Sequence, residues 1–236
     1  MRYRIITISL SVILAALILP VSIADTLVQE TPPGFPAVGE TFIFGRYEQD
    51  NDPNNGMEPI EWRVLAIEDN AALLISEYNL DAMAYDEKTY NSAITWEACS
   101  LRRWLNDNFL STAFTKEEQG SILLSAIKNE NNSYYGTDGG SDTEDRIFLL
   151  SIAETEKYFP VYGTGKAIST AYAKAHGAYI VDASGTTGWW LRSPGFHTDS
   201  VAAMTPGGQL GYIGFFAWAP NVALRPALRL DLKTIR

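Results

Sequence analysis

Alternation of hydrophobic and polar residues predicts strands near the end of the chain. Residues 189–191 form an apolar run that turn residues stop, residues 201–205 alternate weakly, and residues 210–216 form an aromatic run spaced by glycine. The Pro-Gly-Gly sequence at 206–208 fits a tight turn between the last two runs. We therefore expect a set of antiparallel strands here, in the form of a meander.

The last strand of this set is predicted over residues 222–232. Its apolar residues recur with a period of two, which predicts one buried face and places Arg225, Arg229 and Asp231 on the outer face. Pro226 interrupts the pattern. Because proline cannot donate to a ladder, we expect this strand to lie at a sheet edge or to carry a bulge.

The first half of the chain begins with strands. Residues 42–44 lead into a polar loop at 50–59, and residues 60–67 and 71–76 fit a hairpin across the turn Glu68-Asp69-Asn70. A buried strand is expected again at 147–150, after the polar, glycine-rich loop 129–145.

Helices are predicted mainly in the middle of the chain, from helical spacing and capping residues. Thr95 is a plausible N-cap for a helix that includes Trp104 and Phe109, and the pairs Thr115/Glu118 and Ser151/Glu154 fit capping boxes. The expected helices are 95–109, 115–127, 151–159 and 170–176. Strands at both ends with helices between them, without regular βαβ alternation, predict an α+β fold.

The N-terminus predicts export. Arg2 and Arg4 precede the uncharged run 5–19, and small residues lead to Ala24, which is typical of a signal peptide over residues 1–24. An uncleaved N-terminal anchor is the alternative. We expect an arm at 25–37, a single domain at 38–236, and a secreted or cell-surface location.

Charge limits the partners of the chain. Removing the signal takes away two of the 18 basic residues and none of the 28 acidic ones, which leaves a net charge of −12. This excess of acid excludes nucleic acid as a favoured partner, and it leaves the N-terminal segment, if retained, as the membrane contact. Cys99 is the single cysteine, so the exported chain has no internal disulfide. A catalytic thiol is the alternative, but we expect Cys99 to be buried.

Known catalytic and metal-binding motifs are absent. The sequence has no HExxH, CxxC or GxSxG motif, and residues 163–167 lack the leading glycine and the hydroxyl of a phosphate loop. Ser125-Ala126-Ile127-Lys128 matches the SxxK motif of serine hydrolases, but it lies at the end of its predicted helix rather than at the start. We assign no catalytic residue, metal or cofactor. Two acidic loops are weak calcium candidates, with Asp50, Asp52, Asn54 and Glu61 in one and Asp138, Asp142, Glu144 and Asp145 in the other.

The aromatic end of the chain is the favoured ligand site. Its aromatic residues cannot all be inside if the strands alternate, so some of them are expected to line a groove or an exposed face. Flat rings suit sugars and peptides, and nearby polar groups orient a ligand. The alternative is a core with a lid, in which the arginine pairs with a buried carboxylate. The candidate binding residues are Trp189, Trp190, Arg192, His197, Asp199, Tyr212 and Trp218.

Six phrases carry a family resemblance that covers about residues 38–232. They begin at Pro59, Thr95, Leu101, Phe148, Trp190 and Arg225, and read PIEWRVL, TWE, LRRWLN, FLLS, WLRSPG and RPAL. In this order they resemble an exported bacterial domain of unknown function (DUF6273). More remotely, the closing part looks like bacterial C-type-lectin-like domains of the formylglycine-generating-enzyme type. That resemblance implies pairing of the first and last strands, and its two-cysteine oxidase chemistry does not transfer to a chain with one cysteine.

The sequence thus predicts a C-type-lectin-like α+β domain that acts by noncovalent binding, with a glycan or a surface protein as the ligand. A carboxylate-based hydrolase is the competing class, because two catalytic carboxyl groups need only spatial proximity. A structural module of the envelope is the third possibility.

Overall fold

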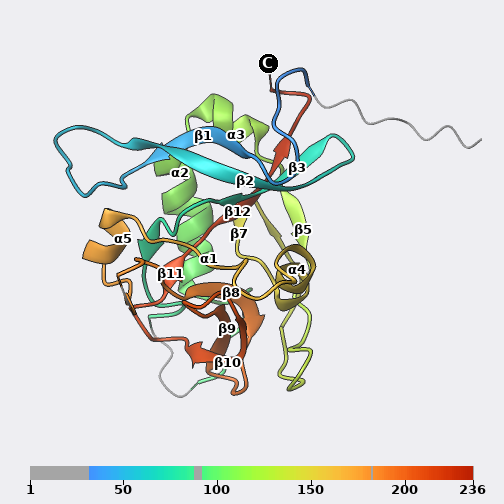
Figure 1. Cartoon of the computed structure of the whole chain (residues 1–236). Helices are drawn as coiled ribbons and strands as arrows, with labels where there is room; N and C mark the ends of the chain where they lie inside the picture. Colours follow the sequence, from blue (N-terminus) through green and yellow to red (C-terminus); the bar gives the residue numbers. More distant parts are fainter. Residues whose placement is uncertain (1–31, 88–91, 182, 236) are drawn as a thin grey trace, which may run out of the picture.

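A computed structural model describes residues 32–87, 92–181 and 183–235 (Figure 1). The predicted signal peptide and the first part of the arm, to residue 31, lie outside this described part. Strands dominate the fold and the helices are short, so the α+β class is confirmed. Within the described residues, no helix has the length and apolar character needed to cross a membrane.

The first sheet is antiparallel and has the order β1-β2-β3-β12-β7. The predicted hairpin is confirmed as β2 and β3. Asp69 and Asn70 turn it with φ of 51° and 58°, a left-handed conformation that these two residue types tolerate. The strands are β1 (Thr41–Tyr47), β2 (Glu58–Glu68), β3 (Ala71–Ser76), β7 (Ile147–Phe148) and β12 (Ala227–Asp231).

The second sheet has the order β10-β9-β8-β11-β4, with β10 at one edge. Its neighbours are antiparallel except for β11 and β8, which run parallel. Gly208, with φ of 76°, lies in the tight turn between β9 and β10 that the sequence predicts. The strands are β4 (Asp81–Ala82), β8 (Trp189–Pro194), β9 (Ser200–Met204), β10 (Leu210–Phe216) and β11 (Ala223–Leu224).

The predicted closing strand at 222–232 is wrong as a single strand. It divides before Pro226 into β11 of the second sheet and β12, which lies inside the first sheet between β3 and β7. Proline lacks the N–H that a continuous ladder needs, so the chain changes sheets there. Arg225 is consequently buried rather than outward-facing, and its guanidinium lies 5.3 Å from the Trp189 ring centre.

The first helical segment begins later than predicted. Its N-cap is Cys99, whose sulfur accepts the Arg102 N–H, rather than Thr95. A π-helical turn interrupts the segment, and the Asn106 side chain within this turn accepts the N–H groups of Arg146 and Ile147. The parts of the segment are α1 (Ser100–Trp104), η1 (Leu105–Phe109) and α2 (Leu110–Ala113).

The capping boxes at Thr115 and Ser151 are both confirmed, but the helix that follows Thr115 is shorter than predicted. It ends at Ser121, where Ile122 is already extended and bridges to Leu230. The following residues pair as a ribbon of β5 with β6 instead of continuing the helix. These elements are α3 (Lys116–Ser121), β5 (Ser125–Ile127), β6 (Thr143–Asp145), α4 (Ile152–Tyr158) and α5 (Ala171–Ala175).

One hydrophobic cluster contains buried residues from both sheets. Trp62, Trp96, Trp189 and Trp190 are its largest fully buried side chains. The pairing of first and last strands implied by the lectin-like resemblance is not found, because β1 pairs with β2 whereas β12 pairs with β3 and β7.

Candidate functional site

The predicted binding residues divide into a buried and a surface group. Trp189 and Trp190 lie on β8, the central strand of the second sheet, and both are fully buried. Their indole N–H groups donate to the carbonyls of Gly165 (3.0 Å) and Met83 (2.9 Å). Neither ring offers a face to a ligand, so their assignment as binding residues is corrected: they belong to the core.

Arg192 is also internal. Its guanidinium donates to the Leu149 carbonyl at 2.7 Å, to the Lys128 carbonyl at 3.0 Å and to the carboxylate of Glu154. A buried arginine with these partners fixes β8 against the segments that follow β5 and β7 and against α4. The prediction of Arg192 as a ligand contact is therefore corrected to a structural role, which the sequence had left open as the alternative.

The surface group consists of His197, Asp199, Tyr212 and Trp218. Tyr212 is half-buried on edge strand β10, and His197 is exposed in the loop between β8 and β9. Trp218 is exposed and stacks on Phe216 with ring centres 5.4 Å apart. Asp199 is half-buried, and its carbonyl accepts the Ala217 N–H at 2.9 Å.

Tyr212 and His197 are the two ends of a continuous row of rings, which we call the aromatic row. From Tyr212 the ring centres are 5.8 Å to Tyr134, then 4.8 Å to Tyr135, 4.7 Å to Phe196 and 4.4 Å to His197. Tyr134 is 73% exposed and Phe196 47% exposed. These rings come from two loops and one strand: the loop between β5 and β6, the loop between β8 and β9, and strand β10.

Asn132 holds the aromatic row together. The side chain is buried, and its Nδ2 donates to the carbonyls of Pro194 (2.8 Å) and Tyr212 (3.0 Å). Its Oδ1 accepts the backbone N–H groups of Tyr134 (2.9 Å) and Tyr135 (3.0 Å). The side-chain amide of Asn132 thus orders the backbone turn at Tyr134 and Tyr135 and fixes this turn to β8 and β10. The rings of the row are therefore preorganised.

A groove of about 360 Å³ adjoins the Tyr212 end of the row. It lies between α4 and β10, and Glu156, Tyr162 and Gln209 contribute to its walls. The Tyr212 hydroxyl donates to Glu156 Oε1 at 2.5 Å. This hydrogen bond, followed by partial burial, raises the pKa of Tyr212 to about 12, so the hydroxyl stays protonated at neutral pH.

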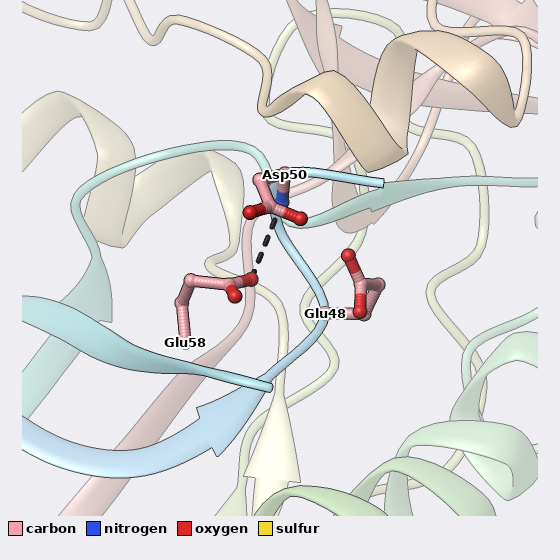
Figure 2. A group of neighbouring side chains, drawn as sticks. All are labelled: Glu48, Asp50 and Glu58. Atoms are coloured by element: carbon pink, nitrogen blue, oxygen red, sulfur yellow. Dashed lines mark hydrogen bonds between the residues drawn. The ribbon is translucent and has the colours of Figure 1, made fainter. Parts of the chain in front are cut away.

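The first acidic loop gathers a different set of carboxylates from the predicted one. Glu48, Asp50 and Glu58 bring ligand atoms within 4.8 Å of one another, as Figure 2 shows, whereas Asp52, Asn54 and Glu61 are not in this group. Each of these carboxylates already accepts a backbone hydrogen bond within the loop. Glu58 accepts the N–H of Asp50, and both Asp50 and Glu48 accept the N–H of Asp52. The backbone N–H partners of these three acids account for the cluster as loop structure.

The acids of the second loop are dispersed. Asp142 pairs with Lys128 at 2.5 Å, Asp138 accepts the Gly140 N–H, and Asp145 is buried against Arg102 and Trp96. Cys99 is fully buried, as predicted, and burial raises the pKa of its thiol to about 12.

Sequence patterns missed three of the five members of the row, Tyr134, Tyr135 and Phe196, together with Asn132. The available signal was an adjacent tyrosine pair within a polar Asn-rich loop, where a core role is disfavoured. Nothing local indicated that Phe196 would meet this pair, because the contact depends on the long-range bonds of Asn132.

Fold and site together define a two-sheet α+β domain with a preorganised aromatic surface. A family model described as "Domain of unknown function (DUF6273)" matches residues 69–232. The chain belongs to this family. The match begins in the β2–β3 turn and includes the whole aromatic row. No curated protein and no solved structure matches the chain.

Proposed function

We propose that this protein is an exported, noncovalent glycan-binding domain and that the aromatic row, with the groove beside Tyr212, is its binding surface. The observation that carries the proposal is the row of five rings joined by four ring contacts and held by Asn132, at a surface where large apolar side chains are exposed. Such rings are costly to expose without a partner.

The chemistry of the surface favours a sugar. Flat ring faces pack against the C–H faces of pyranose rings, while a few polar groups orient the hydroxyls. Glu156 and Gln209 supply acceptors and donors in the groove, and His197 supplies a ring nitrogen at the far end. The net charge of −10 favours neutral glycans over anionic ones.

The expected likeness to C-type-lectin-like domains adds no support, because no solved structure matches the chain and the strand pairing that the likeness implies is absent. Hydrolysis by a carboxylate pair has less support. Hydrogen bonds lower the pKa values of Asp50 and Asp142, which is opposite to the shift that a catalytic acid needs.

A glycan array tests the proposal, with the wild-type protein run beside Tyr134→Ala and Tyr179→Ala. Tyr134 is in the row, whereas Tyr179 is an equally large, 62% exposed tyrosine that lines a separate pocket. We expect a specific glycan signal that falls about tenfold or more in Tyr134→Ala, from the loss of about 1.5–3 kcal/mol of ring contact, and is unchanged in Tyr179→Ala.

Equal loss in both variants, or an unchanged signal in Tyr134→Ala, would show that the row is not the site. No glycan signal from folded protein would overturn the glycan proposal and favour a protein partner for the same surface.

A further inference from the structure

A second cavity, of about 370 Å³, lies away from the aromatic row, between the end of β1, strand β4, helix α5 and the π-helical turn η1. We call it the His176 cleft. Four aromatic side chains and one histidine line it as a second series of ring contacts, and Glu48 adds a carboxylate to its lining. The ring centres are 5.7 Å apart for Trp104–Phe109, 5.1 Å for Phe109–Tyr47, 5.6 Å for Tyr47–Tyr172 and 3.9 Å for Tyr172–His176.

A buried aspartate fixes the histidine of the cleft. Asp81 is 2% exposed, and its Oδ1 lies 2.7 Å from His176 Nδ1 and 2.7 Å from the Ala82 N–H donor. Its Oδ2 accepts the Tyr47 hydroxyl at 2.6 Å. Asp81 therefore contacts three polar groups, and its contact with Nδ1 fixes the orientation of the His176 ring, with Nε2 on the other side of the ring.

The π-helical turn contributes a wall of the cleft. Trp104, Asn108, Phe109 and Thr112 all line the cavity, and they span the places where α1 passes into η1 and η1 into α2. π-helical turns are rare and are concentrated at functional sites. Asn106 anchors this one to β7 through the Ile147 N–H and carbonyl. The cleft is therefore built by distant segments that are held rigidly.

The charges around the cleft select the ligand. Its described lining contains Glu48 and Asp81 but no lysine or arginine. The carboxylates of Asp50 and Glu58 lie within 4.8 Å of the Glu48 carboxylate and of each other (Figure 2). Fixed negative charge repels phosphate and carboxylate groups, whereas aromatic faces beside carboxylates attract ammonium groups.

We propose that the His176 cleft binds a protonated primary amine on a short apolar stem, either a free small amine or a lysyl side chain. Glu48 receives the ammonium group, and the partly exposed rings of Tyr172 and Trp104 pack against the stem beside the ring of His176. This site is independent of glycan binding at the aromatic row, so each can fail without the other.

The test is an NMR titration of the purified protein, observed at the imidazole nitrogens. The chain has two histidines, and His197→Ala leaves His176 as the single ring signal. The probes are pentylamine and Nα-acetyllysine amide, with pentanol and pentanoate as neutral and anionic controls. We expect both amines to shift the His176 resonances at about 1–10 mM, unlike the controls.

Two variants locate the ammonium group. Glu48→Gln should weaken amine binding about tenfold, because it removes one charge-assisted hydrogen bond. Glu117→Gln is the control: it makes the same change of charge at an exposed residue of α3, and it should leave amine binding unchanged.

A response to one amine but not the other supports the site and tells a free amine from a lysyl source. The absence of a shift with either amine, an equal shift with pentanol, or an unchanged affinity in Glu48→Gln would overturn the proposal and leave the histidine and aspartate as a structural pair.

Discussion

Strands β8 and β10 belong to the same sheet and are both rich in aromatic residues, yet they have opposite environments. Every residue of β8 is buried, whereas none of β10 is fully buried and Ile213, Phe215 and Phe216 are exposed. The strands differ in position: β8 lies between β9 and β11, and β10 is an edge. The number of aromatic residues therefore does not distinguish core from surface, but the place of a strand in its sheet does.

The largest expected effect lies on the buried strand. Trp190→Ala should lower the free energy of unfolding by about 3–5 kcal/mol, because it leaves a cavity and removes the indole hydrogen bond to Met83. Phe216→Ala on β10 should change it by less than about 1 kcal/mol. Chemical denaturation measures both. Similar losses in the two variants would contradict the contrast between the strands.

A smaller effect on stability is expected at Asn132, which connects β8 and β10 to the loop that carries Tyr134 and Tyr135. Asn132→Ala should cost about 2–3 kcal/mol, since buried carbonyl and N–H groups lose their partner, and it should also weaken binding at the aromatic row. Asn131→Ala is the matched control, because Asn131 is exposed and its Oδ1 accepts only the Gly139 N–H among the described hydrogen bonds. If Asn132→Ala retains full stability, the row is not held by this amide.

The sequence predicted the local elements that depend on neighbouring residues. Both capping boxes, the Asp69-Asn70 hairpin and the glycine turn before β10 are confirmed, because their signals lie within a few residues. The change of sheet at Pro226 was missed, and the burial of Arg192 was predicted only as the alternative, because both depend on partners distant in sequence, such as Ser76 and Glu154. For the same reason, the sequence pattern identified Tyr212 and His197 at the ends of the aromatic row but not the three rings between them.

Cys99 gives a prediction that depends on pH. Its pKa is about 12 in the folded protein, against 9.0 ordinarily, so the unfolded chain loses this proton first as the pH rises. The contribution to stability is complete below about pH 9 and declines from there to about pH 12. Cys99→Ser keeps an N-cap acceptor without this titration, so its unfolding free energy should fall less steeply over that range. Native Cys99 should also resist thiol reagents at neutral pH, and rapid labelling would refute its burial.

The smallest expected effect concerns calcium. The acids of the loop at Glu48, Asp50 and Glu58 already accept backbone N–H groups, and those of the second loop are dispersed. Calcium at about 1 mM should therefore leave the melting temperature unchanged in a thermal scan. A rise of several degrees would show that one of these loops is a specific calcium site.

The most direct test of the aromatic surface is a carbon-13 NMR titration of the tyrosine and phenylalanine rings with the glycan that the array selects. The account predicts shifts at Tyr134, Tyr135, Phe196 and Tyr212, with the rings of the His176 cleft unaffected. Shifts confined to Tyr47, Phe109 and Tyr172 would contradict it and move glycan recognition to the cleft.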